Sequence, residues 1–148
     1  MPQQLNFFRL RSCACRLSEY LAVLAALLVA MIVVPCGQAQ TACNVMYTIS
    51  PQNTSAFGAA ITIENTGTSA WTNWALTWTF ANGQTVSQLW NGIESQSGAN
   101  VTVTNESYNG SVAAGGSVSG VGFNGTWNGT TNAIPTNFEL NGTACTIN

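Results

Sequence analysis

Short alternating segments separated by Asn-Gly turns make up the chain from Gln40 onward. Apolar residues recur at every second position in Val45-Tyr47-Ile49, Ile61-Ile63, Trp74-Leu76-Trp78-Phe80, Val101-Val103, Val121-Phe123 and Phe138-Leu140. A period of two predicts half-buried strands, and Asn-Gly is a strong signal for a tight hairpin turn. Because helical periodicity is missing there, the pattern predicts an all-β fold. We expect an antiparallel β-sandwich, immunoglobulin-like or jelly-roll-like, of about nine strands.

Strand parity places two of the five tryptophans in the core. Trp74 and Trp78 share parity with Leu76 and Phe80 in the same segment, so we predict that both are buried. For Trp90 the pattern is ambiguous: parity with Val86 would bury the ring, and parity opposite to Leu89 would expose it.

The other two tryptophans lie outside clear strands. Trp127 stands between two Asn-Gly turns, which favours exposure, whereas the pattern around Trp71 decides nothing. Both remain possible additional ligand-binding rings.

Ionisable residues are scarce in the same region. From Gln40 to Asn148 there is no Lys, Arg, His or Asp, and the anions are scattered: Glu64, Glu94, Glu106 and Glu139. Acid–base catalysis usually needs His or a carboxylate pair, zinc needs His/Cys clusters, and nucleic acid needs a basic face. We therefore expect no catalytic residue, no metal, no cofactor and no nucleic-acid partner. A neutral surface with aromatic rings indicates a module that binds a neutral, hydroxyl-rich ligand.

Residues 1–39 are typical of a secretory signal peptide. Arg9, Arg11 and Arg16 precede an apolar run at 21–34, and small residues follow at Gly37 and Ala39. We predict cleavage after Ala39, which leaves a secreted, extracellular domain at 40–148 that contacts no membrane. The alternatives are an uncleaved anchor, although a span needs roughly 20 apolar residues, and a lipid attached to Cys36.

The predicted mature domain keeps one pair of cysteines, Cys43 and Cys145, near its two ends. In an exported protein such a pair indicates one disulfide bond. Closing a loop of about 100 residues would contribute roughly 4–5 kcal/mol by restricting the unfolded state. Two free buried thiols are the alternative.

The order of the motifs from 43 to 145 resembles a known family, the bacterial-type carbohydrate-binding modules of family 2, whose best-known members bind cellulose. The ordered set of segments carries the resemblance, and it includes Cys43-x-Val45-x-Tyr47, Gln88-Leu89-Trp90-Asn91, Tyr108-Asn109-Gly110-Ser111, Gly122-Phe123-Asn124-Gly125 and Leu140-Asn141-Gly142-x-x-Cys145. The resemblance implies a sandwich that carries a strip of three exposed rings, usually Trp, on one flattened face.

In this sequence the strip corresponds to Gln52, Trp90 and Tyr108. The resemblance also implies polar contacts from Gln88 and Asn124. Aromatic faces can stack on the C–H groups of a pyranose ring while amides bind its hydroxyls. Gln52 departs from the family pattern, because no aromatic residue stands where the first ring is expected; we therefore expect weaker binding, or a compensating ring.

The expected partner is an insoluble polysaccharide that a monomeric module adsorbs. Cellulose leads, with chitin and xylan as alternatives; the xylan-binding branch turns its first Trp with an Arg, and residues 40–148 have neither. Two other functions stay open. The chain could be a protein-interaction or surface-structural module whose sugar face is degraded, or an accessory fragment of a glycoside hydrolase that uses two Glu.

Overall fold

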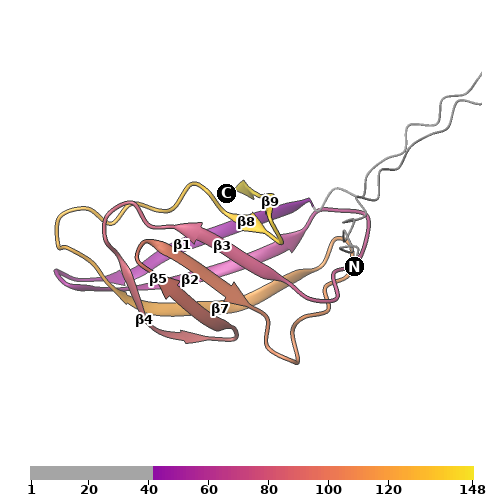
Figure 1. The fold of residues 1–148 in the computed structure, drawn as a ribbon, viewed down its shortest axis with the longest axis horizontal. Coiled ribbons are helices and arrows are strands. Elements are labelled where there is room, and N and C mark those ends of the chain that lie inside the picture. Colours follow the sequence, from indigo (N-terminus) through magenta and orange to yellow (C-terminus); the bar gives the residue numbers. More distant parts are fainter. Residues whose placement is uncertain (1–41) are drawn as a thin grey trace, which may run out of the picture. The chain divides into compact units, whose positions relative to one another are not determined.

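Two β-sheets make up the part of the chain that this computed structural model describes, residues 42–148 (Figure 1). The predicted signal peptide, its cleavage site after Ala39 and Cys36 lie outside the described residues. Among residues 42–148 there is no helix that is long and apolar enough to cross a membrane. The strands are β1 (Cys43–Gln52), β2 (Ala56–Asn65), β3 (Ala75–Thr79), β4 (Thr85–Trp90), β5 (Ile93–Ser97), β6 (Asn100–Thr104), β7 (Ser117–Thr126), β8 (Glu139–Leu140), β9 (Thr143–Ala144) and β10 (Thr146–Ile147).

Each sheet contains five strands. The first has the order β10-β1-β2-β7-β4 and the second β5-β6-β3-β8-β9. All pairs are antiparallel except β1 with β10. The predicted all-β class is therefore confirmed. The described strands number ten, against the nine expected, because the C-terminal segment forms three strands of two residues each.

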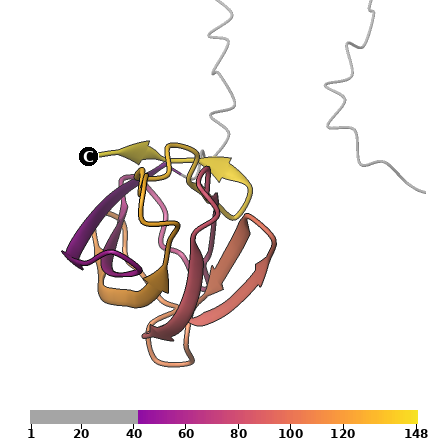
Figure 2. The same cartoon turned by 90° about the vertical axis from the view of Figure 1, so that its left-hand side faces the viewer.

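The core lies between the two sheets, which Figure 2 shows end-on. The apolar positions of the alternating segments all point into it, except that Ile49 is only partly buried. Trp74 and Trp78 are buried, as predicted. Trp78 stacks on Phe123 of the opposite sheet with a centroid distance of 6.1 Å. Aromatic contacts across the layers therefore bind the two sheets together.

Tight turns follow the sequence signals. Asn141 and Gly142 both have positive φ, 50° and 79°, and join β8 to β9. A two-residue hairpin turn with both central residues at positive φ matches the right-handed twist of the strands, which is why Asn-Gly is favoured there.

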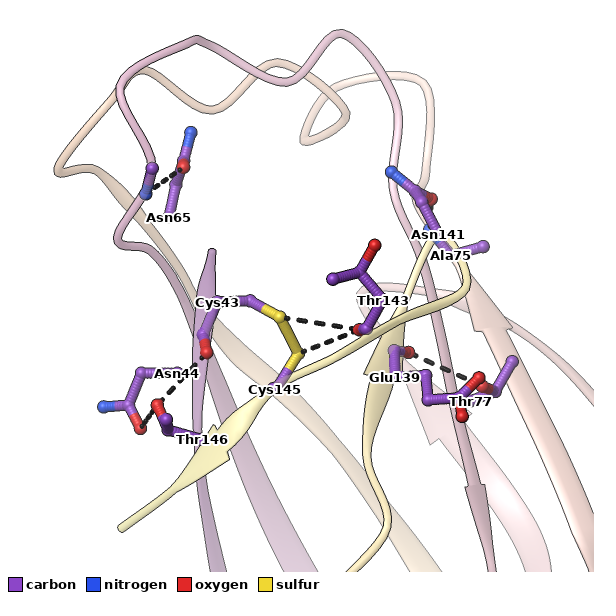
Figure 3. The surroundings of a disulfide bond; sticks show 11 residues. Cys43, Asn44, Asn65, Ala75, Thr77, Glu139, Asn141, Thr143, Cys145 and Thr146 are labelled. Atoms are coloured by element: carbon purple, nitrogen blue, oxygen red, sulfur yellow. Dashed lines mark hydrogen bonds between the residues drawn. A yellow bond between two sulfur atoms is a disulfide. The ribbon is translucent and has the colours of Figure 1, made fainter. Parts of the chain in front are cut away.

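A disulfide bond joins Cys43, at the start of β1, to Cys145, between β9 and β10 (Figure 3). The chain crosses from the second sheet to the first at Cys145. Directly after it, the Thr146 hydroxyl donates to the Cys43 carbonyl at 3.2 Å. The predicted cross-link between the ends of the domain is thus confirmed, and it fixes β10 beside β1.

Candidate functional site

Small residues keep the outer face of the first sheet low. The outward positions of β2 include Gly58 and Ala60, and β7 places Gly122 and Asn124 on the same side. Because side chains alternate along a strand, the apolar residues next to these positions in the sequence point into the core. A face with few projecting side chains is a suitable platform for a flat ligand.

Trp90 lies on this platform. In β4 it pairs with Gly122 of β7, and a Cβ atom built on Gly122 would lie only 2.6 Å from the ring. Because Gly122 has no side chain, the indole ring of Trp90 can lie directly on the backbone at this position. The side chain of Trp90 remains 42% exposed, so one part of the ring packs on the sheet and the rest is available to a ligand.

A β-bulge resolves the ambiguous parity of Trp90. The pairing of β4 with β7 shifts by one residue between Val86 and Gln88. One extra residue reverses the direction of all that follow. Val86 and Leu89 therefore both pack against the core, while Gln88 and Trp90 face outward.

A hydrogen bond links Tyr108 to Asn91, the residue that follows Trp90 in the turn between β4 and β5. Its ring is 71% exposed, and its hydroxyl donates to Oδ1 of Asn91 at 2.9 Å. The side-chain amide of Asn91 donates to the Gly120 carbonyl at 2.6 Å. The backbone carbonyl of Asn91 accepts from the side-chain amide of Asn109 at 2.9 Å. One residue thus holds the loop that carries Tyr108 against β4 and β7. The sequence analysis named Asn91 only as part of the motif that contains Trp90, and not for this role.

Gln88 and Asn124 lie side by side on the two strands that carry Trp90 and Gly122. They are register partners on β4 and β7, and both are exposed. The Ser87 hydroxyl donates to the backbone carbonyl of Asn124 at 2.9 Å, which fixes the bulged strand at this point. Their neutral amides offer both donors and acceptors to hydroxyl groups.

Gln52 lies in β1, which β2 and β7 separate from β4, and a register shift after Ile49 pairs it with Phe57. It ends β1, is exposed, and accepts a 2.9 Å hydrogen bond at Oε1 from the Asn132 side chain. Asn132 accepts in turn from Gln84, which is buried. The long loop between β7 and β8 therefore fixes the orientation of Gln52.

Trp71 and Trp127, the two possible additional ligand-binding rings, are both less exposed than Trp90 and Tyr108. Trp71 is only 8% exposed; it forms a bridge with Val112 and belongs to the core. Its ring therefore offers little surface to a ligand. Trp127 is half-buried, and its indole N–H donates to the Asn53 carbonyl at 2.8 Å. The expected exposure of Trp127 was too high, because its ring packs on the core and its hydrogen bond holds the turn between β1 and β2.

The site residues are all uncharged, and the described residues contain no group of three or more His, Cys, Asp or Glu side chains that could hold a metal ion. The two exposed rings can stack on a neutral, extended molecule, and the neighbouring amides can form hydrogen bonds to it.

Known proteins share this pattern. The family model described as "Cellulose binding domain" matches residues 43–145. The chain belongs to this family, carbohydrate-binding module family 2. The resemblance of the motifs is thereby confirmed.

Relatives of this chain include an exoglucanase and a chitinase. Exoglucanase A of Cellulomonas fimi is 51% identical over 105 residues, 71% of this chain and 12% of that protein. Chitinase C of Streptomyces lividans is 35% identical over 109 residues, 74% of this chain and 17% of that protein. The chain therefore spans only a small part of the relatives that it matches.

Among solved structures, the chitin-binding domain of Chi18aC from Streptomyces coelicolor is 33% identical, with a TM-score of 0.58. The alignment covers 71% of this chain and 95% of that domain. It shows that this domain and the described part of the chain share their fold.

Proposed function

We propose that residues 1–39 direct export and that residues 40–148 form a non-catalytic, monomeric module that adsorbs to insoluble polysaccharide, with crystalline cellulose as the first ligand. The observation that carries the proposal is the pair of exposed rings, Trp90 and Tyr108, which are linked through Asn91. Trp90 and Tyr108 stack on pyranose rings of the polysaccharide, and Asn91 keeps the two rings in a fixed relation.

The amides complete the recognition. Gln88 and Asn124, on the two strands that carry Trp90 and Gly122, bind the hydroxyl groups at the edge of a glucan chain. Burying about 100 Å² of ring face contributes on the order of 2–3 kcal/mol per ring before ordering costs. Since two rings serve where the family pattern has three, adsorption is weaker than that of a three-ring module.

Non-catalytic action is supported by the distribution of the carboxylates. Glu64 and Glu139 belong to β2 and β8, Glu94 to β5, and Glu106 to the loop after β6. None is one of the five site residues. Hydrolysis of a glycosidic bond uses two carboxyl groups that face each other across the bond.

Retention on insoluble polysaccharides tests the proposal. The purified protein is mixed with microcrystalline cellulose, chitin or insoluble xylan, and the bound fraction is compared with that of the Trp90→Ala and Tyr108→Ala variants. We expect retention on cellulose that both substitutions weaken. Retention on none of the three polymers would favour a protein-interaction module, and release of soluble sugar that a Glu substitution abolishes would establish an enzyme.

A further inference from the structure

A hollow of about 340 Å³ lies between the loop that follows Tyr108 and the beginning of β7. Its lining includes Asn109, Ser111, Val112, Ala113, Ser117 and Ser119. These residues are distinct from the five site residues, but Asn109 follows Tyr108 directly and donates a hydrogen bond to the Asn91 carbonyl. The hollow therefore borders the part of the site that carries the second exposed ring.

Strand β7 connects the hollow to both rings. Gly122 pairs with Trp90. The Gly120 carbonyl accepts a hydrogen bond from the residue that binds the Tyr108 hydroxyl. Residues 117–119, which come next toward the start of the strand, line the hollow. At ~3.3 Å per residue, the middle of this range lies about 13 Å along the strand from Gly122. A ligand that extends along β7 from Trp90 past Tyr108 therefore reaches the hollow.

A β-bulge makes room at this end of β7. The pairing with β2 shifts between Ile61 and Ile63, so that Ser119 and Gly120 both stand opposite Thr62. Gly120 has a φ of 81°, which glycine adopts without strain. Both residues of the bulge are exposed. Two small, exposed neighbours leave space where a regular strand would direct one side chain outward and the next into the core.

The loop on the other side of the hollow is anchored to the core. Val112 forms a bridge with Trp71 through two backbone hydrogen bonds of 2.8 and 3.0 Å. The indole N–H of Trp74, which is buried, donates to the Asn109 carbonyl at 2.9 Å. Because both walls are fixed in the folded protein, a ligand can bind there with little cost in ordering the loop.

The lining offers hydroxyl groups beside apolar surface. Ser111, Ser117 and Ser119 are exposed, and their hydroxyl groups make no hydrogen bond to another described residue. Ala113 and the edges of two valines supply the apolar part. The lining residues are all uncharged, and Glu64, the partner of Ser117 on β2, would repel an anion. A ligand group that combines an apolar carbon with a neutral hydroxyl matches both parts.

We propose that this hollow is a further subsite, which receives the hydroxymethyl group of a hexopyranose unit that lies beyond Tyr108. The inference rests on the proposed function, since Trp90 and Tyr108 hold the same polysaccharide chain. The methylene carbon packs on Ala113, while the hydroxyl forms hydrogen bonds with Ser111 and Ser119. Every unit of a glucan carries this group and the units of a xylan backbone lack it, so the hollow favours hexose polymers. Contacts there also offset part of the loss of a third ring.

An NMR titration of the unsubstituted protein tests the subsite without any variant. We expect cellohexaose to shift the backbone amide signals of Ser111, Ser117 and Ser119 together with those of Trp90 and Tyr108. Xylohexaose, which can bind only through the rings, should leave the three serine signals in place. Serine signals that stay unshifted when cellohexaose saturates the Trp90 signal would overturn the subsite, and so would equal shifts of these signals with xylohexaose.

Replacing both Ser111 and Ser119 by Ala removes the hydroxyl groups and leaves the hollow open. We expect the ratio of cellohexaose affinity to xylohexaose affinity, measured by calorimetry, to fall about fivefold because two modest hydrogen bonds are lost. Ser95→Ala combined with Ser97→Ala is the matched control, since both serines are exposed on β5 of the second sheet. The control should leave the ratio unchanged, and urea unfolding should give both variants wild-type stability. An unchanged ratio in the Ser111 and Ser119 variant would contradict the subsite.

Trp90→Ala separates the two proposals. If it weakens cellohexaose binding while the Ser111 and Ser119 variant keeps the wild-type ratio, only the subsite fails. If it weakens the binding of neither sugar, the aromatic face itself is wrong.

Discussion

A single glycine supports the central ring of the site. A Cβ at Gly122 would meet not only the Trp90 ring but also the Ala59 carbonyl oxygen, at 2.8 Å. The ring can move away from the added atom, but the carbonyl oxygen of a central strand cannot. Gly122 therefore serves both the packing of the sheet and the position of the indole.

We predict that Gly122→Ala lowers the free energy of unfolding by about 1–3 kcal/mol through overpacking and displaces the Trp90 ring. Urea unfolding and the fluorescence emission of the folded state measure the two effects. Ala60→Ser, at the exposed partner position on β2, is the control and should change neither. Wild-type stability and emission in Gly122→Ala would show that the contact with Trp90 is not tight.

A second residue links stability to alkaline pH. Burial raises the pKa of the Tyr47 hydroxyl above its usual value of about 10, and this hydroxyl has no hydrogen-bond partner among the described residues. In the unfolded chain the phenol ionises near pH 10, whereas in the folded protein it stays neutral. Folding stability is therefore complete below about pH 10 and falls as the pH rises above it.

We predict that Tyr47→Phe removes this alkaline loss. Because the hydroxyl is buried without a partner, the substitution should leave stability at pH 7 unchanged or slightly higher. Urea unfolding of both proteins at neutral pH and above pH 10 provides the measurement. An equal alkaline decline in the two proteins would assign it to another group.

At the scale of the elements, the short C-terminal strands depend on the disulfide. β10 contains two residues and lies at the edge of its sheet, so few backbone hydrogen bonds hold it. The Cys43–Cys145 bond closes a separation of 102 residues, which restricts the unfolded chain strongly.

We predict that replacing both cysteines by Ala lowers the free energy of unfolding by about 2–5 kcal/mol. Chemical denaturation of the double variant beside the oxidised wild type measures the loss. Wild type that has been fully reduced should behave like the double variant. Stability independent of the bond would mean that the strands hold their own register.

The elements also show how far the sequence carries. Alternation and turn signals were enough for the sandwich and for the burial of Trp74 and Trp78, and the pair of cysteines near the ends of the domain was enough for the disulfide. They could not decide Trp90, because its direction depends on a bulge that no residue type marks. Trp71 was equally undecided, since a single bridge to Val112, distant in sequence, buries it.

The candidate site was only partly predictable for a related reason. Trp90, Tyr108, Gln88 and Asn124 follow from the motifs. The link from Tyr108 to Asn91 and the link from Gln52 to Asn132 join residues that are far apart in the sequence. Only the folded chain brings such pairs together.

For the whole molecule, the charge pattern predicts how adsorption responds to salt. Residues 40–148 contain no Lys, Arg, His or Asp, and the proposed site residues are neutral. Screening acts on charges, so it leaves stacking and neutral hydrogen bonds unaffected. We predict that the affinity for cellulose changes less than about twofold between 0.05 and 1 M sodium chloride. Depletion assays over this range check it, and a steep decline with salt would indicate an ionic contact.

The most direct test of the aromatic face is the dissociation constant of Trp90→Ala on microcrystalline cellulose. Loss of a ring worth on the order of 2–3 kcal/mol should raise this constant at least about tenfold. Ile147→Ala removes an exposed apolar side chain at the opposite edge of the same sheet and should bind like the wild type. If Trp90→Ala also binds cellulose with wild-type affinity, the platform of β7 and β4 is not the surface that adsorbs.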